Sequence, residues 1–302
     1  MEYDIIIVGA GTAGLSAAIY GLRSGKQVLV LEKMNYGGQI VNTSVIENYP
    51  GIANISGFEF ATNLYKQAVN LGSVIRYEKV IELREEGQYK FVLTEQSGYK
   101  GKTVILATGA KNRLLGLKRE EELTGYGVSY CAACDGMFYK GKRTAVVGGG
   151  NTALEDALVL SSYCEKVFLI HRRETLRGEE IRLKALREKE NVEFLLNCQV
   201  EKLHGKERLE KITIFNDQTG IREDVNVDGI FVAIGRVPEN EIFEKQIKLD
   251  FSGYIIAGEE CRTSLSGVFA AGDCRTKRVR QLATAAADGA VAALQACEYM
   301  IN

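Results

Sequence analysis

The sequence predicts an α/β protein that contains two Rossmann-like dinucleotide-binding folds, and three observations support this prediction. A short β-branched run that ends in glycine and opens into a small-residue helix occurs near the N-terminus, and the same pattern returns from Arg143 onward. Between the two copies lies the sequence Cys131-Ala132-Ala133-Cys134-Asp135-Gly136. A chain of 302 residues is long enough for two domains of ordinary size.

The first copy begins with a predicted buried strand over residues 3–8. It continues into Gly9-Ala10-Gly11-Thr12-Ala13-Gly14 and a predicted helix over residues 15–24. We expect Gly9 to form a tight turn, Gly11 to let the backbone approach a pyrophosphate, and Gly14 to allow close packing of helix on strand.

The next predicted strand, residues 27–31, leads to Glu32. A carboxylate at this position accepts a hydrogen bond from a ribose 2′-hydroxyl and repels a 2′-phosphate. The first copy therefore predicts a site for FAD or NAD. A glycine-rich turn that binds no ligand is the alternative interpretation.

The second copy consists of a predicted strand over residues 143–147 and the loop Gly148-Gly149-Gly150-Asn151-Thr152-Ala153. Its following strand, residues 166–170, leads into His171-Arg172-Arg173, with Arg177 close behind. Guanidinium groups bind a ribose 2′-phosphate through bidentate, charge-assisted hydrogen bonds, so this copy predicts an NADPH site. The alternative is a solvated basic segment whose arginines pair with Glu174, Glu179 and Glu180.

The Cys-x-x-Cys pair can accept two electrons when its disulfide opens and release them when the disulfide closes. Alone, the motif fits a redox pair, half a zinc site or chance, but its position between two nucleotide fingerprints favours a redox pair. A zinc site needs further ligands, and the sequence holds no second Cys-x-x-Cys and no histidine near this one. We therefore expect no metal. Asp135 is the predicted acid that delivers a proton to a leaving thiolate, with a turn-forming role ahead of Gly136 as the alternative.

Composition narrows the function classes. A formal net charge of -1 gives no basic footprint for nucleic acid. The sequence shows no leader and no apolar run of membrane-spanning length, so no membrane partner is expected. Seven cysteines at scattered positions do not form a secreted disulfide framework, which predicts the reducing cytoplasm. Four of them are expected to fill cores: Cys164, Cys198, Cys261 and Cys297.

Together these motifs resemble the low-molecular-weight, bacterial-type thioredoxin reductase family across nearly the whole chain. The resemblance rests on the two fingerprints, the Cys-x-x-Cys-Asp motif, the His-Arg-Arg-x-x-x-Arg run and four further segments. These segments are Gly37-Gly38-Gln39, Glu47-Asn48-Tyr49-Pro50-Gly51, Ala107-Thr108-Gly109 and Gly267-Val268-Phe269-Ala270-Ala271-Gly272-Asp273. Two departures are Lys118, where family members usually have proline, and Cys274, where an apolar residue is usual.

The resemblance implies an NADPH-binding domain, residues 114–242, inserted into a FAD-binding domain, residues 1–113 and 243–302. It implies linkers near residues 110–115 and 238–243. It assigns catalysis to Cys131, Cys134 and Asp135. The implied FAD contacts are Gly9, Gly11, Thr12, Ala13, Gly14, Glu32, Gly38, Gln39, Asn48, Ala107, Thr108, Gly109, Gly272, Asp273, Arg280 and Gln281. The implied NADPH contacts are Gly148, Gly150, Asn151, Thr152, Ala153, His171, Arg172, Arg173 and Arg177.

The family's activity implies that electrons pass from NADPH to FAD, to the Cys131/Cys134 disulfide and on to thioredoxin or a thioredoxin-like protein. It also implies a homodimer and rotation of the inserted domain about its linkers. The flavoprotein component of an alkyl hydroperoxide reductase is the nearest alternative, although it normally carries an additional amino-terminal extension. Related flavoproteins that use ferredoxin generally lack the intact second fingerprint. A nucleotide-bound redox sensor or assembly scaffold is the non-enzymatic alternative.

Overall fold

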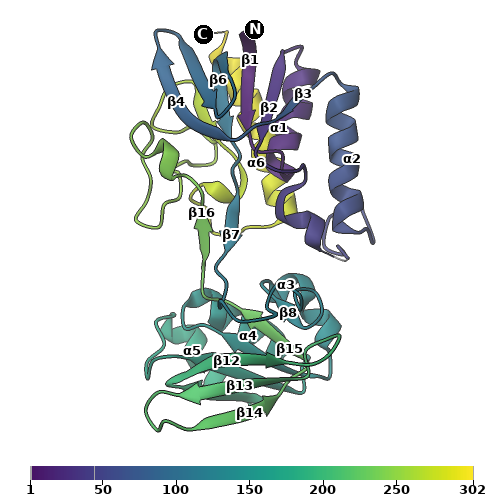
Figure 1. Ribbon diagram of the computed structural model, residues 1–302, viewed down its shortest axis with the longest axis vertical. Helices are drawn as coiled ribbons and strands as arrows, with labels where there is room; N and C mark the ends of the chain where they lie inside the picture. The colour runs from purple at the N-terminus through teal and green to yellow at the C-terminus, as the bar shows by residue number, and fades with distance from the viewer. Residues whose placement is uncertain (1, 44, 302) are drawn as a thin grey trace. The chain divides into compact units, whose positions relative to one another are not determined.

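The computed structural model describes residues 2–43 and 45–301 and divides into two compact units (Figure 1). Unit 1 comprises Met1–Lys111 and Val237–Asn302, and unit 2 comprises Asn112–Arg236. Each crossing between them is a short strand, β7 (Ala110–Asn112) and β16 (Arg236–Pro238), and these two strands pair. The predicted α/β class is confirmed. The assignment of residues 1–113 and 243–302 to FAD, and of 114–242 to NADPH, stays a prediction.

Unit 1 is built on a sheet of seven strands in the order β3-β2-β1-β6-β5-β4, with β17 also paired to β6. Buried β-branched and leucine side chains explain its parallel part, where Ile7 lies between Val30 and Ile105. The antiparallel β4 and β5 extend the sheet beside β6. The strands are β1 (Glu2–Val8), β2 (Val28–Glu32), β3 (Val74–Tyr77), β4 (Val80–Glu86), β5 (Tyr89–Thr94), β6 (Gly98–Leu106) and β17 (Val268–Ala270).

Small residues let the helices of unit 1 approach the sheet and one another. A Cβ on Gly289 of α6 would lie 2.2 Å from the carbonyl oxygen of Ala13 in α1, so only glycine allows this helix contact. The longer helices are α1 (Thr12–Arg23), α2 (Gly57–Asn70) and α6 (Leu282–Tyr299); the short ones are η1 (Gly38–Asn42), η3 (Glu241–Phe243) and η4 (Gly272–Cys274). No helix in the described part of the chain has the length and apolarity that a bilayer crossing needs.

Unit 2 repeats the parallel sheet on a smaller scale, in the order β11-β10-β9-β15-β8. A second sheet of three antiparallel strands, β12-β13-β14, lies between β11 and β15 in the chain. It was not predicted from the sequence. The parallel strands are β8 (Val128–Ser129), β9 (Arg143–Val147), β10 (Lys166–His171), β11 (Val192–Leu196) and β15 (Gly229–Val232). The antiparallel strands are β12 (Cys198–His204), β13 (Lys211–Asn216) and β14 (Arg222–Asn226).

The helices of unit 2 are α3 (Ala132–Asp135), η2 (Gly136–Tyr139), α4 (Asn151–Ser161) and α5 (Glu180–Arg187). The prediction that four cysteines fill cores is confirmed, because all of them are free and buried. Cys274 is also buried, and its thiol donates to the carbonyls of Leu106 and Ala271, each at 3.3 Å.

Candidate active site

The first glycine loop joins β1 to α1 in unit 1, and its glycines have different tasks. Gly9 has a φ of 107°, and a Cβ there would lie 2.4 Å from the carbonyl oxygen of Ala107. A Cβ on Gly14 would lie 1.9 Å from the carbonyl oxygen of Gly9. A Cβ on Gly11, by contrast, would meet no atom of the described residues within 4 Å. Two glycines therefore allow close packing, while Gly11 leaves open space in front of the backbone.

The start of α1 is suited to an anion. Gly11 is the N-cap, no side chain caps the helix, and its first turn contains no acidic residue. The first amides of a helix lack partners inside the helix, and the positive end of its dipole attracts phosphate. Thr12 and Ala13 occupy these first positions.

Glu32 ends β2 at the same edge of the sheet. Its carboxylate accepts hydrogen bonds from the backbone N–H of Ala10 at 2.8 Å and of Met34 at 3.0 Å. These bonds fix the carboxylate beside the glycine loop. Because an ionised carboxylate has about four acceptor positions, Glu32 can still accept a ribose hydroxyl.

Further predicted residues of unit 1 lie around this loop. The backbone N–H of Gly37 donates to the carbonyl of Ala10 at 2.7 Å, which joins the segment that carries Gly38 and Gln39 to the loop. Gln39 donates to the carbonyl of Ala110. Thr108 follows β6, and its hydroxyl donates to Asn240 at 2.8 Å. Within the part of the chain that the structure describes, a Cβ on Gly109 would meet no atom within 4 Å.

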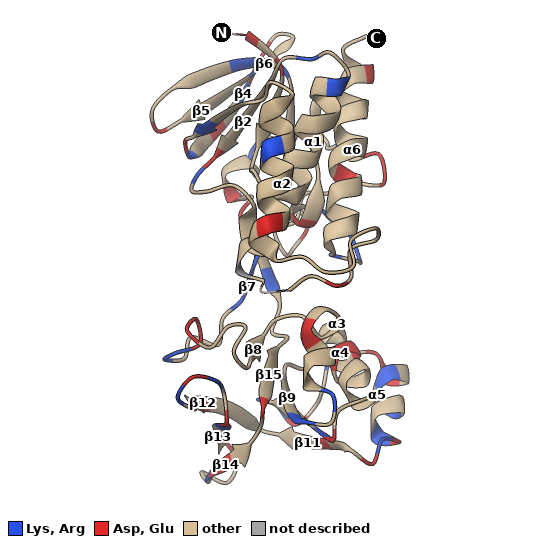
Figure 2. Ribbon diagram, turned by 90° about the vertical axis from the view of Figure 1, so that its right-hand side faces the viewer, with Lys and Arg blue, Asp and Glu red and all other residues tan. Residues whose placement is uncertain are grey.

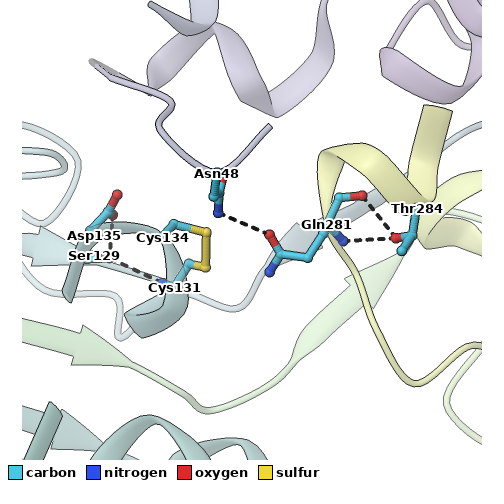
Figure 3. The surroundings of a disulfide bond; sticks show 7 residues. All are labelled: Asn48, Ser129, Cys131, Cys134, Asp135, Gln281 and Thr284. Atoms are coloured by element: carbon cyan, nitrogen blue, oxygen red, sulfur yellow. Dashed lines mark hydrogen bonds between the residues drawn. A yellow bond between two sulfur atoms is a disulfide. The ribbon is translucent and has the colours of Figure 1, made fainter. Parts of the chain in front are cut away.

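The last group of unit 1 residues lies at η4 and the start of α6. Gly272 lies against Ala13, because a Cβ on Gly272 would be 2.8 Å from the Cβ of Ala13. Asp273 follows it in η4. The guanidinium of Arg280 lies 4.2 Å from the centre of the Tyr254 ring. Figure 3 shows Asn48 donating to Gln281, at 3.5 Å, where Gln281 and Thr284 cap α6.

Asp288, which sequence reasoning did not identify, supports the η4 turn. It is buried, and its carboxylate accepts from the N–H of Gly272 at 2.9 Å, from two guanidinium nitrogens of Arg275 at 2.8 Å each, and from Lys277 at 2.9 Å. Burial raises its pKa, but the hydrogen bonds from Arg275, Lys277 and Gly272 outweigh burial and hold the pKa below its usual value. The sequence signal was an acidic residue inside an alanine-rich helix.

The second glycine loop joins β9 to α4 in unit 2 and reproduces the geometry of the first. A Cβ on Gly148 would lie 2.4 Å from the carbonyl oxygen of Ala233, whereas one on Gly150 would meet no atom of residues 2–43 and 45–301 within 4 Å. Gly150 is the N-cap of α4, again without a side-chain cap. Asn151 and Thr152 open the helix, and the Asn151 side chain accepts from the N–H of Glu179 at 2.7 Å. Ala153, at the third fingerprint position, is buried.

His171 ends β10 against this loop. A Cβ on Gly149 would lie 2.3 Å from the His171 ring, so the imidazole packs directly on the glycine backbone. The ring is buried, and its Nε2 has no hydrogen-bond partner among residues 2–43 and 45–301. Burial lowers the pKa of His171, and the charges of Arg177, Arg172 and Arg173 lower it further. The charges of all three arginines therefore act on this one histidine.

Among the described residues, the exposed arginines do not form the ion pairs that a solvated basic segment would require. Within the described ranges, Glu179 pairs with Arg182 and Glu180 pairs with Arg187. Arg172, Arg173 and Arg177 form no ion pair in that part of the chain. The N–H of Arg177 donates to the carbonyl of Gly149 at 2.6 Å, so the basic segment is tied to the glycine loop.

Cys131 and Cys134 form a disulfide, with their Cα atoms 5.3 Å apart, at helix α3 of unit 2 (Figure 3). Ser129 precedes them on β8. Its hydroxyl donates to the Asp135 carboxylate at 2.6 Å and accepts from the N–H of Cys131 at 3.1 Å. Burial raises the pKa of Asp135, and the hydrogen bond from Ser129 opposes that rise only in part. A carboxyl that keeps its proton to higher pH thus lies next to the disulfide.

The residues present fit two dinucleotides. At both loops the middle glycine faces open space at an uncapped helix start, which is the arrangement that a pyrophosphate needs. In unit 2, the partnerless buried Nε2 of His171 gives the loop a polar group that a bound ligand can satisfy.

The comparisons with known proteins agree with this arrangement. The family model described as pyridine nucleotide-disulphide oxidoreductase matches residues 3–290. A thioredoxin reductase of Treponema pallidum is 42% identical over 99% of this chain and 97% of its own length. One from Peptoclostridium acidaminophilum is 41% identical over 99% and 97%.

A solved structure, the thioredoxin reductase from Streptococcus pyogenes, matches with a TM-score of 0.95 at 40% identity and covers 99% of this chain and 98% of that one. The matched region includes both glycine loops and the Cys-x-x-Cys disulfide of this chain. The chain therefore belongs to the pyridine nucleotide-disulphide oxidoreductase family and, within it, to the thioredoxin reductases.

Proposed function

We propose that this chain is an NADPH-dependent thioredoxin-disulfide reductase in which electrons pass from NADPH through FAD to the Cys131–Cys134 disulfide and then to a thioredoxin-like protein. The observation that supports it best is the disulfide beside Asp135, a carboxyl whose pKa is raised by burial, in the same chain as two separate glycine loops suited to dinucleotides. A disulfide with a neighbouring carboxyl can exchange electrons in pairs, with a proton available for the thiolate that forms.

FAD and NADPH, the cofactors of this family, supply hydride and electron transfer when bound. We assign FAD to the loop after β1, where the carboxylate of Glu32 would accept the adenosine ribose hydroxyl. We assign NADPH to the loop after β9, where Arg172, Arg173 and Arg177 would hold the 2′-phosphate. The separation of acidic and basic strand ends gives each cofactor one suitable site.

The remaining chemistry belongs to the dithiol and its neighbours. Reduction breaks the Cys131–Cys134 bond with two electrons and leaves one thiolate and one thiol. The thiolate attacks the disulfide of the partner, forming a mixed disulfide and releasing a partner thiolate. Asp135 holds a proton at its carboxyl for that leaving group, and Ser129 orients the carboxyl by donating to it.

The finer parts of the proposal follow from the family. The partner is a thioredoxin or thioredoxin-like protein, the chain is a homodimer, and the enzyme works in the cytoplasm. Rotation of the inserted domain about β7 and β16 would let the dithiol meet first the flavin and then a protein substrate. The five free cysteines, all buried, suit a reducing compartment where only Cys131 and Cys134 cycle.

A reductive titration tests the proposed function. Anaerobic enzyme loaded with FAD should lose its flavin absorbance on addition of NADPH and regain it on addition of oxidised thioredoxin. NADH should reduce the flavin far less efficiently. If thioredoxin does not reoxidise the flavin but a peroxidase disulfide does, the alkyl hydroperoxide reductase alternative replaces this proposal. If NADPH does not reduce the flavin at all, the chain is a sensor or scaffold.

The variant Asp135→Asn should be slower but not inactive. A positioned proton donor contributes typically about 10²–10⁴-fold in rate, and asparagine keeps the acceptor for Ser129 while losing the proton. Because the pKa of Asp135 is raised, the wild-type exchange rate should fall as pH rises through that pKa, and the variant should lack this fall. Stopped-flow rates of flavin reoxidation by thioredoxin from pH 5 to 9 measure it.

The control for this variant is Asp217→Asn, which removes an exposed carboxylate from the same unit. It should leave the rate and its pH profile unchanged. If the rates for Asp135→Asn equal the wild-type rates at every pH, Asp135 has only a turn-forming role.

A further inference from the structure

The redox helix α3 is seated directly on α4. Its C-terminal neighbour Gly136 is buried, and a Cβ there would lie 2.1 Å from the hydroxyl of Tyr163 and 3.1 Å from Leu160. Gly136 thus packs closely on Leu160 of α4 and on Tyr163, which follows that helix. Figure 2 shows acidic residues on both α3 and α4. Negative charge in α4 is therefore placed next to the redox helix.

One of these acidic residues, Asp156, bonds the backbone of the Cys-x-x-Cys motif. Its carboxyl accepts a hydrogen bond from the N–H of Ala132, the buried residue that directly follows Cys131. The preceding N–H, that of Cys131 itself, donates to Ser129. Two successive amides at the first redox cysteine are thus held by side chains, one from β8 and one from α4.

Charges of both signs act on the Asp156 carboxyl, and they oppose each other. Arg236 favours its ionised form, whereas Glu155, its neighbour in α4, opposes it, and Glu155 is itself paired with Arg182 at 2.7 Å. Asp156 also contributes to the raised pKa of Tyr163, after burial and Cys164. Burial is the largest influence on Asp156, and it raises the pKa of this carboxyl to about 7. The group therefore changes charge in the neutral range.

We propose that Asp156 is a positioning residue of the redox centre: its carboxyl, held on the Ala132 amide, places a negative charge beside Cys131 and so sets how readily the Cys131–Cys134 disulfide is reduced. The inference rests on the proposed function, because it assigns a regulator to the same dithiol. It differs from the role of Asp135, which supplies a proton to a leaving group.

The direction of the effect follows from charge balance. Reduction of the disulfide by NADPH through FAD yields one thiolate, one thiol and NADP⁺. An ionised carboxylate nearby opposes the new thiolate, so it raises the thiol pKa and favours the disulfide. A protonated carboxyl exerts no such effect. The dithiol should therefore become harder to reduce as Asp156 ionises.

The variant Asp156→Asn tests this inference, because its amide oxygen can still accept the Ala132 N–H while the charge is lost. At pH 8, redox equilibrium with dithiothreitol should show the variant disulfide to be about tenfold easier to reduce, a rise of about 30 mV for a two-electron couple. The difference should shrink toward zero at pH 5.5, where the wild-type carboxyl is protonated. Alkylation of the reduced enzyme by iodoacetamide should show a thiol pKa about one unit lower.

The matched control is Glu155→Gln, which removes an equal charge one residue away, from a side chain that is half exposed and paired with Arg182. It should produce less than a third of the shift. An equal potential in wild type and Asp156→Asn at pH 8, or a difference that does not depend on pH, overturns the proposal. Both readouts use the dithiol alone and need no thioredoxin. A failed thioredoxin assay would therefore count against the proposed function and leave this test standing.

Discussion

The variants Cys131→Ser and Cys134→Ser are expected to lose turnover with a protein disulfide, by at least about 1,000-fold, while keeping FAD that NADPH can reduce. Neither cysteine lies in a glycine loop, so both cofactor cradles remain intact. A single remaining thiol cannot complete the cycle, because resolution of the mixed disulfide requires the second sulfur. Steady-state thioredoxin reduction and anaerobic flavin titration of the same preparations measure the two halves of this expectation.

The control is Cys164→Ser in the same unit. The Cys164 thiol donates to the carbonyl of Tyr139 at 3.3 Å, and a serine hydroxyl can make the same bond. Turnover by this variant should stay close to wild type. If either redox variant still reduces thioredoxin at a normal rate, the Cys131–Cys134 pair is not the electron carrier. Loss of flavin from both would mean that the substitutions disturb the fold and not only the exchange.

The sequence was sufficient for features that depend on a few consecutive residues. The strand predicted over residues 143–147 is confirmed as β9. The tight turn at Gly9, which has a φ of 107°, could be predicted because a strand-to-helix turn of this kind favours glycine at its first residue, whatever surrounds it. The helix predicted from Leu15 instead begins at Thr12, since the helical turns start inside the glycine motif.

The sequence was insufficient where residues distant in the chain meet. Asp288 lies 16 residues beyond Gly272, whose N–H donates to it, and nothing in an alanine-rich helix indicates that contact. Ser129, in β8, and Asp156, in α4, each bond the segment of the redox helix α3 from another element of the fold. Side chains brought together by folding carry no local pattern, so polar partners of a site are harder to predict than its glycine loops.

Replacing Arg172, Arg173 and Arg177 together by glutamine should raise the Michaelis constant for NADPH by at least about 10-fold and leave that for NADH nearly unchanged. Charge-assisted hydrogen bonds contribute roughly 1.5–3 kcal/mol each, and about 1.4 kcal/mol corresponds to one decade. The arginines are exposed and would share one phosphate, so their contributions should be smaller than this range and not additive. NADH has no 2′-phosphate and loses no contact. Initial-rate kinetics with both coenzymes measure the difference.

The control must distinguish the loss of these three arginines from the loss of any three positive charges in unit 2. Replacing Lys184, Arg187 and Lys189 by glutamine also removes three exposed positive charges from unit 2, and it should change neither Michaelis constant by more than about twofold. Added salt should weaken NADPH binding to the wild type more than NADH binding, because screening acts on the extra phosphate charge. A triple variant that still prefers NADPH would show that the three arginines form a solvated surface. The selectivity would then have to come from His171 and the glycine loop.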